Sequence, residues 1–199
     1  MGAAEASGAD AQRDEAFRAE LVALIPHLRA FARTLCGDPT GADDLAQDAM
    51  LKAWDARESF AMGTNMKAWT FMILRNQFYS EKRRSWRQSQ LDQEAAERTL
   101  VAVDDPEAPV ALDELRQGLA MLPAEQREAL VLVGAGGFAY EEAAAICECA
   151  VGTVKSRVSR ARRALQAILE SGSYRRDGSS AGQAMDTILA DAERLSSLK

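Results

Sequence analysis

Residues 150–169 combine a helical hydrophobic pattern with positive side chains and contain no acid. The positive residues are Lys155, Arg157, Arg160, Arg162 and Arg163. Solvated helices usually mix both charge signs, so a helix of one sign indicates a surface that binds phosphate groups. The alternative interpretation is a solvated basic helix in an ordinary helical bundle.

The residues before this basic helix predict the rest of a helix-turn-helix, over 139–165. Ala143, Ala144 and Ala145 are small enough to let a second helix cross closely, and Glu148-Cys149-Ala150 predicts the turn. In this motif the second helix enters the major groove of DNA with its N-terminal residues against the bases. The segment therefore favours a DNA-binding protein.

A second basic segment, residues 65–87, carries six positive residues against one acid, Glu81, with aromatic residues interleaved. Positive charge beside aromatic rings suits single-stranded DNA, whose bases stack on the rings. For Trp69, Phe71 and Phe78 the favoured alternative is a place in a hydrophobic core. Asn76 differs, because its amide both donates and accepts hydrogen bonds and can read the edge of a flipped base.

Residues 43–55, DDLAQDAMLKAWD, place acids and amides along one side of a predicted helix. Such a face alone is most often simply solvated. Beside two basic segments it predicts a docking surface for a basic protein partner.

The composition supports an all-α protein that is not an enzyme. Of 199 residues 47% are hydrophobic but only 6% aromatic, and the net charge is -6. The sequence predicts no membrane span, no secretory signal and, with three cysteines, a cytoplasmic location. Cys147 and Cys149 are one residue apart and the only histidine, His27, is distant, so we expect no metal site. No nucleophile–base pair or phosphate-binding loop is recognisable, and we expect no cofactor.

The chain divides into two helical domains joined by an acidic linker. We expect disorder over 1–13, a first domain over 14–90, a linker over 91–110, a second domain over 111–170 and an extension over 171–199. The first domain is predicted to hold one helix that ends at Gly37-Asp38-Pro39, a helix from Asp43 or Asp44 to Asp55, and a helix over 66–87. The second is predicted to hold helices over 111–121, 124–133, 139–147 and 151–169. The extension contains a short amphipathic stripe, which is Met185, Ile188, Leu189, Ala192 and Leu195.

Three segments in this order resemble a bacterial sigma factor of the extracytoplasmic-function (ECF) group. DDLAQDAMLKAW is similar to the helix that binds core RNA polymerase, and NMKAWTFMILRNQFYSEKRR to the promoter-melting segment. LPAEQREALVLVGAGGFAYEEAAAICECAVGTVKSRVSRARRAL is similar to the fourth sigma region, which reads the −35 element. Within that segment, LVGAGGFAYEEAAAICECAVGTVKSRV is especially similar to the EcfG-type sigma factors of the alphaproteobacterial general stress response.

The resemblance implies three sets of contacts. For core polymerase they are Asp44, Leu45, Gln47 and Asp48. For the melted −10 element they are Phe60, Trp69, Arg75, Asn76, Lys82, Arg83 and Arg84. For the duplex −35 element they are Thr153, Lys155, Ser156, Arg157, Ser159 and Arg160. The resemblance also implies control by a small anti-sigma factor of the NepR type. A response-regulator decoy of the PhyR type would release the sigma factor from it.

The sequence departs from the family at two places. Ala139 stands where a Ser or Thr often caps the first helix of the helix-turn-helix, a loss of ~1 kcal/mol of capping. The extension after about Ser171 passes the usual end of the family, and its amphipathic stripe is a candidate to cover the second domain or to contact a partner.

Two other functions stay open on the sequence alone. A free-standing helix-turn-helix regulator explains 139–165 but gives the basic segment 65–87 no role. A decoy that mimics a sigma factor to capture an anti-sigma factor would not need the basic residues that both segments retain.

Overall fold

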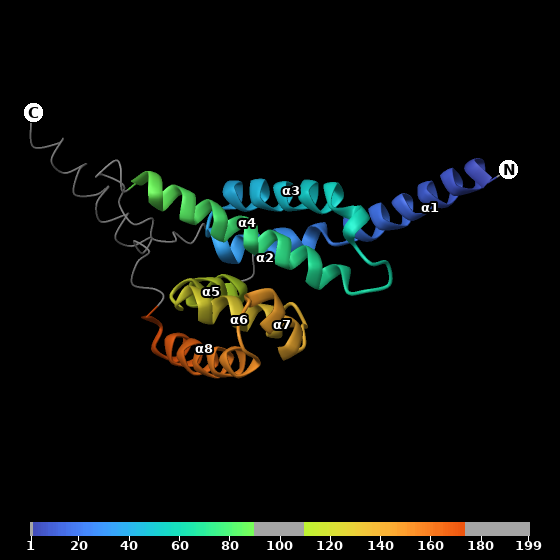
Figure 1. Ribbon diagram of the computed structural model, residues 1–199. Helices are drawn as coiled ribbons and strands as arrows, with labels where there is room; N and C mark the ends of the chain where they lie inside the picture. Colours follow the sequence, from blue (N-terminus) through green and yellow to red (C-terminus); the bar gives the residue numbers. More distant parts are fainter. Residues whose placement is uncertain (1, 90–109, 174–199) are drawn as a thin grey trace, which may run out of the picture.

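The computed structural model describes residues 2–89 and 110–173, all of whose regular elements are helices, which confirms the all-α prediction. Two helical bundles lie one above the other in Figure 1. The N-terminal bundle contains α1 (Gly2–Ala23), α2 (Ile25–Cys36), α3 (Pro39–Asp55), a 3-10 turn (Arg57–Ser59) and α4 (Met66–Ser89). The C-terminal bundle contains α5 (Val110–Ala120), α6 (Ala124–Gly134), α7 (Tyr140–Cys147) and α8 (Val151–Ser171).

The first predicted helix differs from the observed structure at its start and in its middle, whereas its predicted end at Gly37 agrees with the end of α2. Helix α1 begins at Gly2, where disorder over 1–13 was expected, because these residues include many alanines, which favour helix strongly. The single helix expected up to Gly37 is divided between Ala23 and Ile25. Pro26 explains the division, since proline has no N–H to donate and fits the first turn of a new helix.

Helix α3 begins four residues earlier than its acidic pattern suggested. The Asp38 side chain accepts a hydrogen bond from the Gly41 N–H at 2.6 Å, and Pro39 occupies the first turn. An aspartate cap followed by proline is a helix start, so the predicted start at Asp43 or Asp44 was wrong. The first turn of α3 was hidden by its lack of apolar residues.

The two bundles share one hydrophobic core. Phe71 of α4 stacks on Phe31 of α2, with ring centroids 4.9 Å apart, and meets Phe138 of the C-terminal bundle edge-on at 5.0 Å. All three rings are buried, which confirms the core interpretation for Phe71. Buried residues of α2, α3, α4, α6, α7 and α8 belong to the same cluster. The described bundles are therefore closed against each other.

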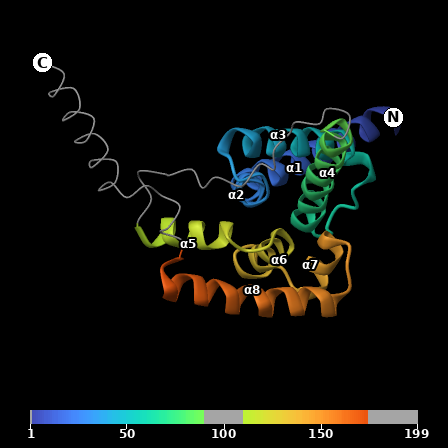
Figure 2. The same ribbon diagram turned by 90° about the vertical axis from the view of Figure 1, so that its left-hand side faces the viewer.

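The helices of the C-terminal bundle agree with the prediction to within two residues. Helices α7 and α8 form the helix-turn-helix, and Figure 2 shows α8 on the far side of the bundle, with α5, α6 and α7 between it and the N-terminal bundle. Glu148 in the turn has φ 51° and ψ 45°, a left-handed conformation that costs an L side chain on the order of 1 kcal/mol. The acidic linker and the amphipathic stripe at 185–195 lie outside the described residues.

Within the described ranges, no helix has the length and apolar composition required to cross a membrane. No group of three or more His, Cys, Asp or Glu side chains among residues 2–89 and 110–173 is placed to hold a metal ion.

Candidate nucleic-acid interface

Helix α8 presents one apolar and one basic face. Val154, Val158 and Ala161 are buried, and their spacing turns Lys155, Ser159 and Arg160 to solvent. Lys155 Nζ lies 5.7 Å from the centroid of the Tyr140 ring, so its charge stays at the surface. The exposed basic face of α8 is available in this closed arrangement.

Three of the predicted −35 residues are less free. The Ser156 hydroxyl donates to the Thr153 carbonyl at 2.9 Å and accepts from Arg160 Nη2 at 3.0 Å, while Thr153 itself is half-buried. Arg157 forms an ion pair with Glu125 of α6. The structure thus directs Arg157 toward its own bundle, and Ser156 positions Arg160.

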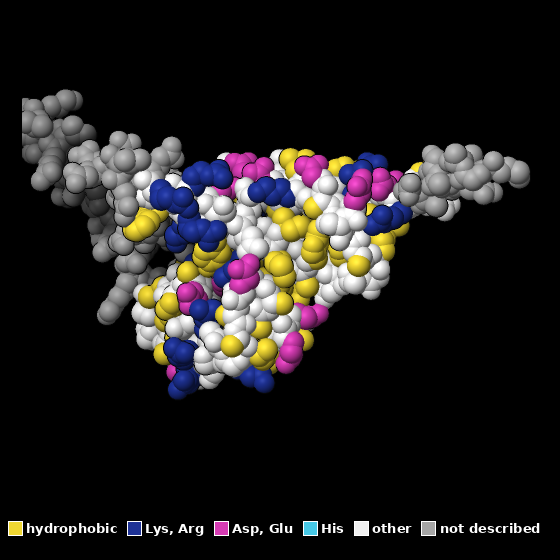
Figure 3. All heavy atoms as spheres, in the orientation of Figure 1, with side chains coloured by type: hydrophobic (Ala, Val, Ile, Leu, Met, Phe, Trp, Pro, Cys, Tyr) yellow, Lys and Arg dark blue, Asp and Glu magenta, His cyan; other side chains and the backbone are white. Residues whose placement is uncertain are grey.

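The C-terminal part of α4 forms a second basic surface. Lys82, Arg83, Arg84 and Arg87 are all exposed, and Figure 3 shows positive side chains gathered over this end of the helix. Trp86 lies among them and is 65% exposed, so its ring is open for a base to stack on it.

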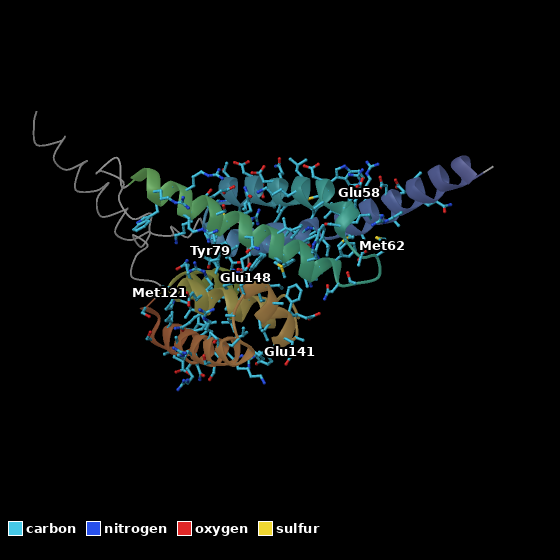
Figure 4. All side chains as sticks on the ribbon, viewed as in Figure 1. Glu58, Met62, Tyr79, Met121, Glu141 and Glu148 are labelled. Carbon is cyan, nitrogen blue, oxygen red and sulfur yellow. The ribbon has the colours of Figure 1, made fainter. Side chains whose placement is uncertain are left out.

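An open groove of about 820 Å³, here called the α4 groove, runs between α4 and the end of α7. Its volume falls in the range of small-ligand pockets. Four of the predicted −10 residues line it, namely Trp69, Arg75, Asn76 and Arg83. The C-terminal bundle supplies Cys147 and Glu148 on the opposite wall, and Figure 4 shows Glu148 beside Tyr79 of α4.

Lys52 and Gln77 also line the α4 groove, and the sequence did not single them out. Lys52 Nζ is hydrogen-bonded to Gln77 Oε1, and Gln77 Nε2 to Glu81. Lys52 is the one positive residue in the acidic segment 43–55, and this opposite charge is the feature by which the sequence could have singled it out.

Phe60 is 4% exposed and lies beneath Trp69, with ring centroids 5.0 Å apart. Phe17 of α1 meets both rings at 5.7 and 6.1 Å. In this arrangement Phe60 supports Trp69 from within the core, whereas Trp69 reaches the groove.

A buried polar contact joins the two bundles at the groove. Arg75 Nε donates to Glu128 Oε1 at 2.6 Å, and the Tyr79 hydroxyl donates to Glu128 Oε2 at 3.2 Å. The Glu128 side chain is 1% exposed and that of Arg75 is 14% exposed. We call these three residues the α4–α6 latch.

Burial dominates the titration of the latch. It raises the pKa of Glu128, and the opposing pull of Arg75 and the Tyr79 hydrogen bond offsets this only in part. Burial also lowers the pKa of Arg75, but here the attraction of Glu128 outweighs it and the pKa is raised. The two directions are compatible because Glu128 is the more deeply buried partner. Burial, then the charge of Glu128, raises the pKa of Tyr79 to about 12, so its hydroxyl stays protonated and donates.

Further hydrogen bonds cross the same interface. Buried Arg127 of α6 donates through Nε to the Thr34 carbonyl of α2 at 3.0 Å. Lys67 Nζ donates to the Gly136 carbonyl at 2.8 Å, and Asn65 Nδ2 to Glu142 Oε1 at 2.5 Å. The closed arrangement is therefore specific, with donors placed on particular carbonyls.

The acidic face of α3 is exposed at Asp44, Gln47 and Asp48. Leu45 is 3% exposed and packs in the core, so here it holds the helix in place and is not a surface contact. Asp43, beside this face, pairs with Arg29 Nη2 at 2.5 Å.

Cys147, the first cysteine of the helix-turn-helix, lies in the hydrophobic core. Cys147 is buried, and burial followed by the nearby charge of Glu128 raises the pKa of its thiol to about 12. A thiol with so high a pKa stays protonated and is a poor nucleophile or metal ligand at neutral pH.

Two family models match this chain. Sigma-70 region 2 matches residues 21–88, and Sigma-70, region 4, matches residues 112–165. The chain is 47% identical over 155 residues to the ECF RNA polymerase sigma factor EcfG of Rhodopseudomonas palustris (strain TIE-1), which covers 78% of this chain and 86% of that protein.

Solved structures agree with these matches. The sigma factor RpoE in complex with the anti-sigma factor NepR, from Bartonella quintana, aligns with a TM-score of 0.70 at 48% identity, over 78% of this chain and 98% of that chain. The PhyRSL–NepR complex from Sphingomonas sp. Fr1 aligns with a TM-score of 0.52 over 73% of this chain and 84% of that chain, but at 23% identity it shows the fold alone. The sequence, the two regions and the fold together place this chain in the ECF group of the sigma-70 family of RNA polymerase sigma factors.

Proposed function

We propose that this chain binds core RNA polymerase and directs it to the −35 and −10 elements of general stress response promoters. The observation that carries the proposal is the presence of two separate basic surfaces on one chain, the exposed face of α8 and the α4 groove with the basic end of α4. The protein acts in the cytoplasm as an initiation subunit and catalyses no reaction of its own.

The two surfaces would divide the work. Lys155, Ser159 and Arg160 lie on a helix that fits the major groove of duplex −35 DNA. Asn76 and Trp69 would hold a flipped −10 base, with Arg83 on the backbone. The exposed acids of α3, Asp44 and Asp48, would contact core polymerase.

We also infer that an anti-sigma factor of the NepR type inhibits this chain, and that a decoy of the PhyR type releases the chain from the inhibitor. Support comes from the 48% identity to RpoE, a sigma factor solved in complex with NepR. A chain that is itself the decoy would share this fold, but it would not need the exposed arginines of α4 and α8. A free-standing regulator would leave the α4 groove without a role.

Run-off transcription with purified core polymerase on a candidate stress promoter tests the main proposal. Promoter-specific transcripts are expected only when the chain is added, and addition of a NepR-type protein should suppress them. Specific binding to a duplex operator without polymerase, together with no transcript, would favour the free-standing regulator instead.

Asn76→Ala should weaken recognition of one −10 base by about fivefold while leaving core binding intact, because a base-edge hydrogen bond is worth ~1 kcal/mol. The measurement is transcription from promoters that differ at single −10 positions. Ser85→Ala, an exposed position on the same helix, is the matched control. An equal loss at all promoters would contradict base reading by Asn76.

A further inference from the structure

Glu148 is the left-handed cap at the end of α7, a position that the turn requires but that does not require a glutamate. Its backbone is left-handed, and it is the one non-glycine residue with positive φ in the described ranges. Glycine would make the same turn without strain. A strained residue that is held in place points to a function for its side chain.

The side chain of Glu148 belongs to the wall of the α4 groove, although it lies on the other bundle (Figure 4). Lys52 and Arg83 line the same groove, and no ion pair with a described residue neutralises Lys52, Arg83 or Glu148. Arg75 is different, since it is paired with Glu128. The groove therefore holds Arg83 and Lys52 without an ion pair to a described residue, although Lys52 is hydrogen-bonded to Gln77, and Glu148 is the acid that the C-terminal bundle adds to the lining.

We propose that Glu148 is a built-in electrostatic block of the α4 groove. In the free chain its carboxylate adds a negative charge to the wall of the groove that Lys52 and Arg83 also line, and it repels single-stranded DNA that enters the groove. When the C-terminal bundle moves away, the carboxylate leaves and the groove binds the strand. This inference rests on the proposed function, because it concerns the groove assigned to the −10 strand.

Charge removal in the full-length chain tests the proposal without polymerase. The probe is a fluorescein-labelled oligothymidylate of about 12 nucleotides, and the measurement is fluorescence anisotropy at low salt. Glu148→Gln keeps the size of the side chain and the turn, and should bind about three- to tenfold more tightly, because one nearby like charge is removed. Glu141→Gln makes the same charge change on an exposed side chain of α7 that points away from the groove (Figure 4) and should change binding less than about twofold.

An Arg83→Ala background shows whether the gain arises in the groove. There the gain from Glu148→Gln should be smaller, since one of the two cations that draw the strand toward Glu148 is absent. A gain of undiminished size in this background, or an equal gain from Glu141→Gln, overturns the proposal. Small-angle X-ray scattering should give the same radius of gyration for Glu148→Gln as for the parent chain; a larger radius would mean that the bundles have separated, which also overturns it.

Glu148→Gly separates charge from backbone geometry. It should raise the melting temperature by about 2–4 °C through relief of the left-handed glutamate, and bind the probe at least as tightly as Glu148→Gln. Tighter binding by the glycine variant alone would assign the block to the turn and not to the charge. The run-off assay with the parent chain distinguishes failure of this inference from failure of the proposed function. If the parent chain gives transcripts but Glu148→Gln does not change binding of the oligothymidylate, only this inference is wrong. If the parent chain gives no transcripts, the proposed function is wrong.

Discussion

Single residues in this chain acquire their roles from the partner that the fold gives them. Arg75 and Arg83 are both arginines of one helix and both line the α4 groove. Arg75 is held by the buried carboxylate of Glu128, whereas Arg83 is exposed. Only the second is available for a phosphate while the bundles are closed.

Glu128→Gln should remove the part of the pH dependence of folding stability that comes from protonation of Glu128. Burial raises the pKa of Glu128 in the folded chain, so its contribution to stability is fully present below the unfolded pKa and is lost as pH rises through the folded pKa. The measurement is the free energy of unfolding of both chains by urea titration from about pH 4 to 8. As pH rises, the parent chain should lose stability relative to Glu128→Gln.

Glu128→Ala is the contrasting variant. It leaves Arg75 in a mostly buried position without its partner and should cost about 2–3 kcal/mol. If the difference between the parent chain and Glu128→Gln shifted toward the parent as pH rises, ionised Glu128 would be a net stabiliser and the inferred direction would be wrong.

Helices in the C-terminal bundle depend on their ends as much as on their apolar faces. Helix α7 has only half of a capping box. The Glu142 carboxylate accepts a hydrogen bond from the Ala139 N–H at 2.8 Å, but Ala139 has no side-chain oxygen that could accept one from the Glu142 N–H. The helix is short, with eight residues, so a missing cap is a large share of its stability.

Ala139→Ser should raise the free energy of unfolding by about 0.5–1 kcal/mol, because the serine oxygen would accept from the backbone at the start of α7. Chemical denaturation measures the change. Ala145→Ser, an exposed position inside the same helix, should be neutral or slightly destabilising. Equal effects at both positions would show that the cap contributes nothing.

Lys155→Ala should reduce the salt dependence of promoter binding by the polymerase that carries this chain. One phosphate contact fewer lowers the slope of log affinity against log salt by about 1. Lys155 is exposed on α8, so folding should be unaffected. Arg33→Ala, exposed on α2, should leave the slope unchanged, and an unchanged slope for Lys155→Ala would contradict the assigned contact.

At the scale of the whole molecule, the closed arrangement leaves the two DNA surfaces unequally accessible. The exposed face of α8 lies on the far side of the molecule from the N-terminal bundle (Figure 2), whereas the α4 groove has a wall from the C-terminal bundle. Under the proposed function, a −10 strand held by Asn76 would meet the C-terminal bundle in this closed arrangement, and the shared aromatic core opposes separation of the bundles.

Phe138→Ala should shift the free chain toward a more open form. The ring is buried against Phe71, and truncation of a buried phenylalanine costs about 3–5 kcal/mol. The expected result is a larger radius of gyration by small-angle X-ray scattering with unchanged helical circular dichroism. Leu115→Ala, a partly exposed apolar residue of α5, should change neither. An unchanged radius for Phe138→Ala with helices intact would mean that the polar contacts alone hold the bundles closed.

The sequence by itself determined the helices of the C-terminal bundle, the helix-turn-helix and the two basic segments, because periodicity and local charge are properties of neighbouring residues. It placed Asn76 and Lys155 on the correct helices for the same reason. The tertiary structure alone decided that Phe60 and Leu45 are buried, that Arg157 pairs with Glu125, and that Arg75 meets Glu128 across 53 residues of chain. It also decided that Glu148 lines the α4 groove. Such pairings depend on how distant segments pack, and no local pattern of residues encodes them.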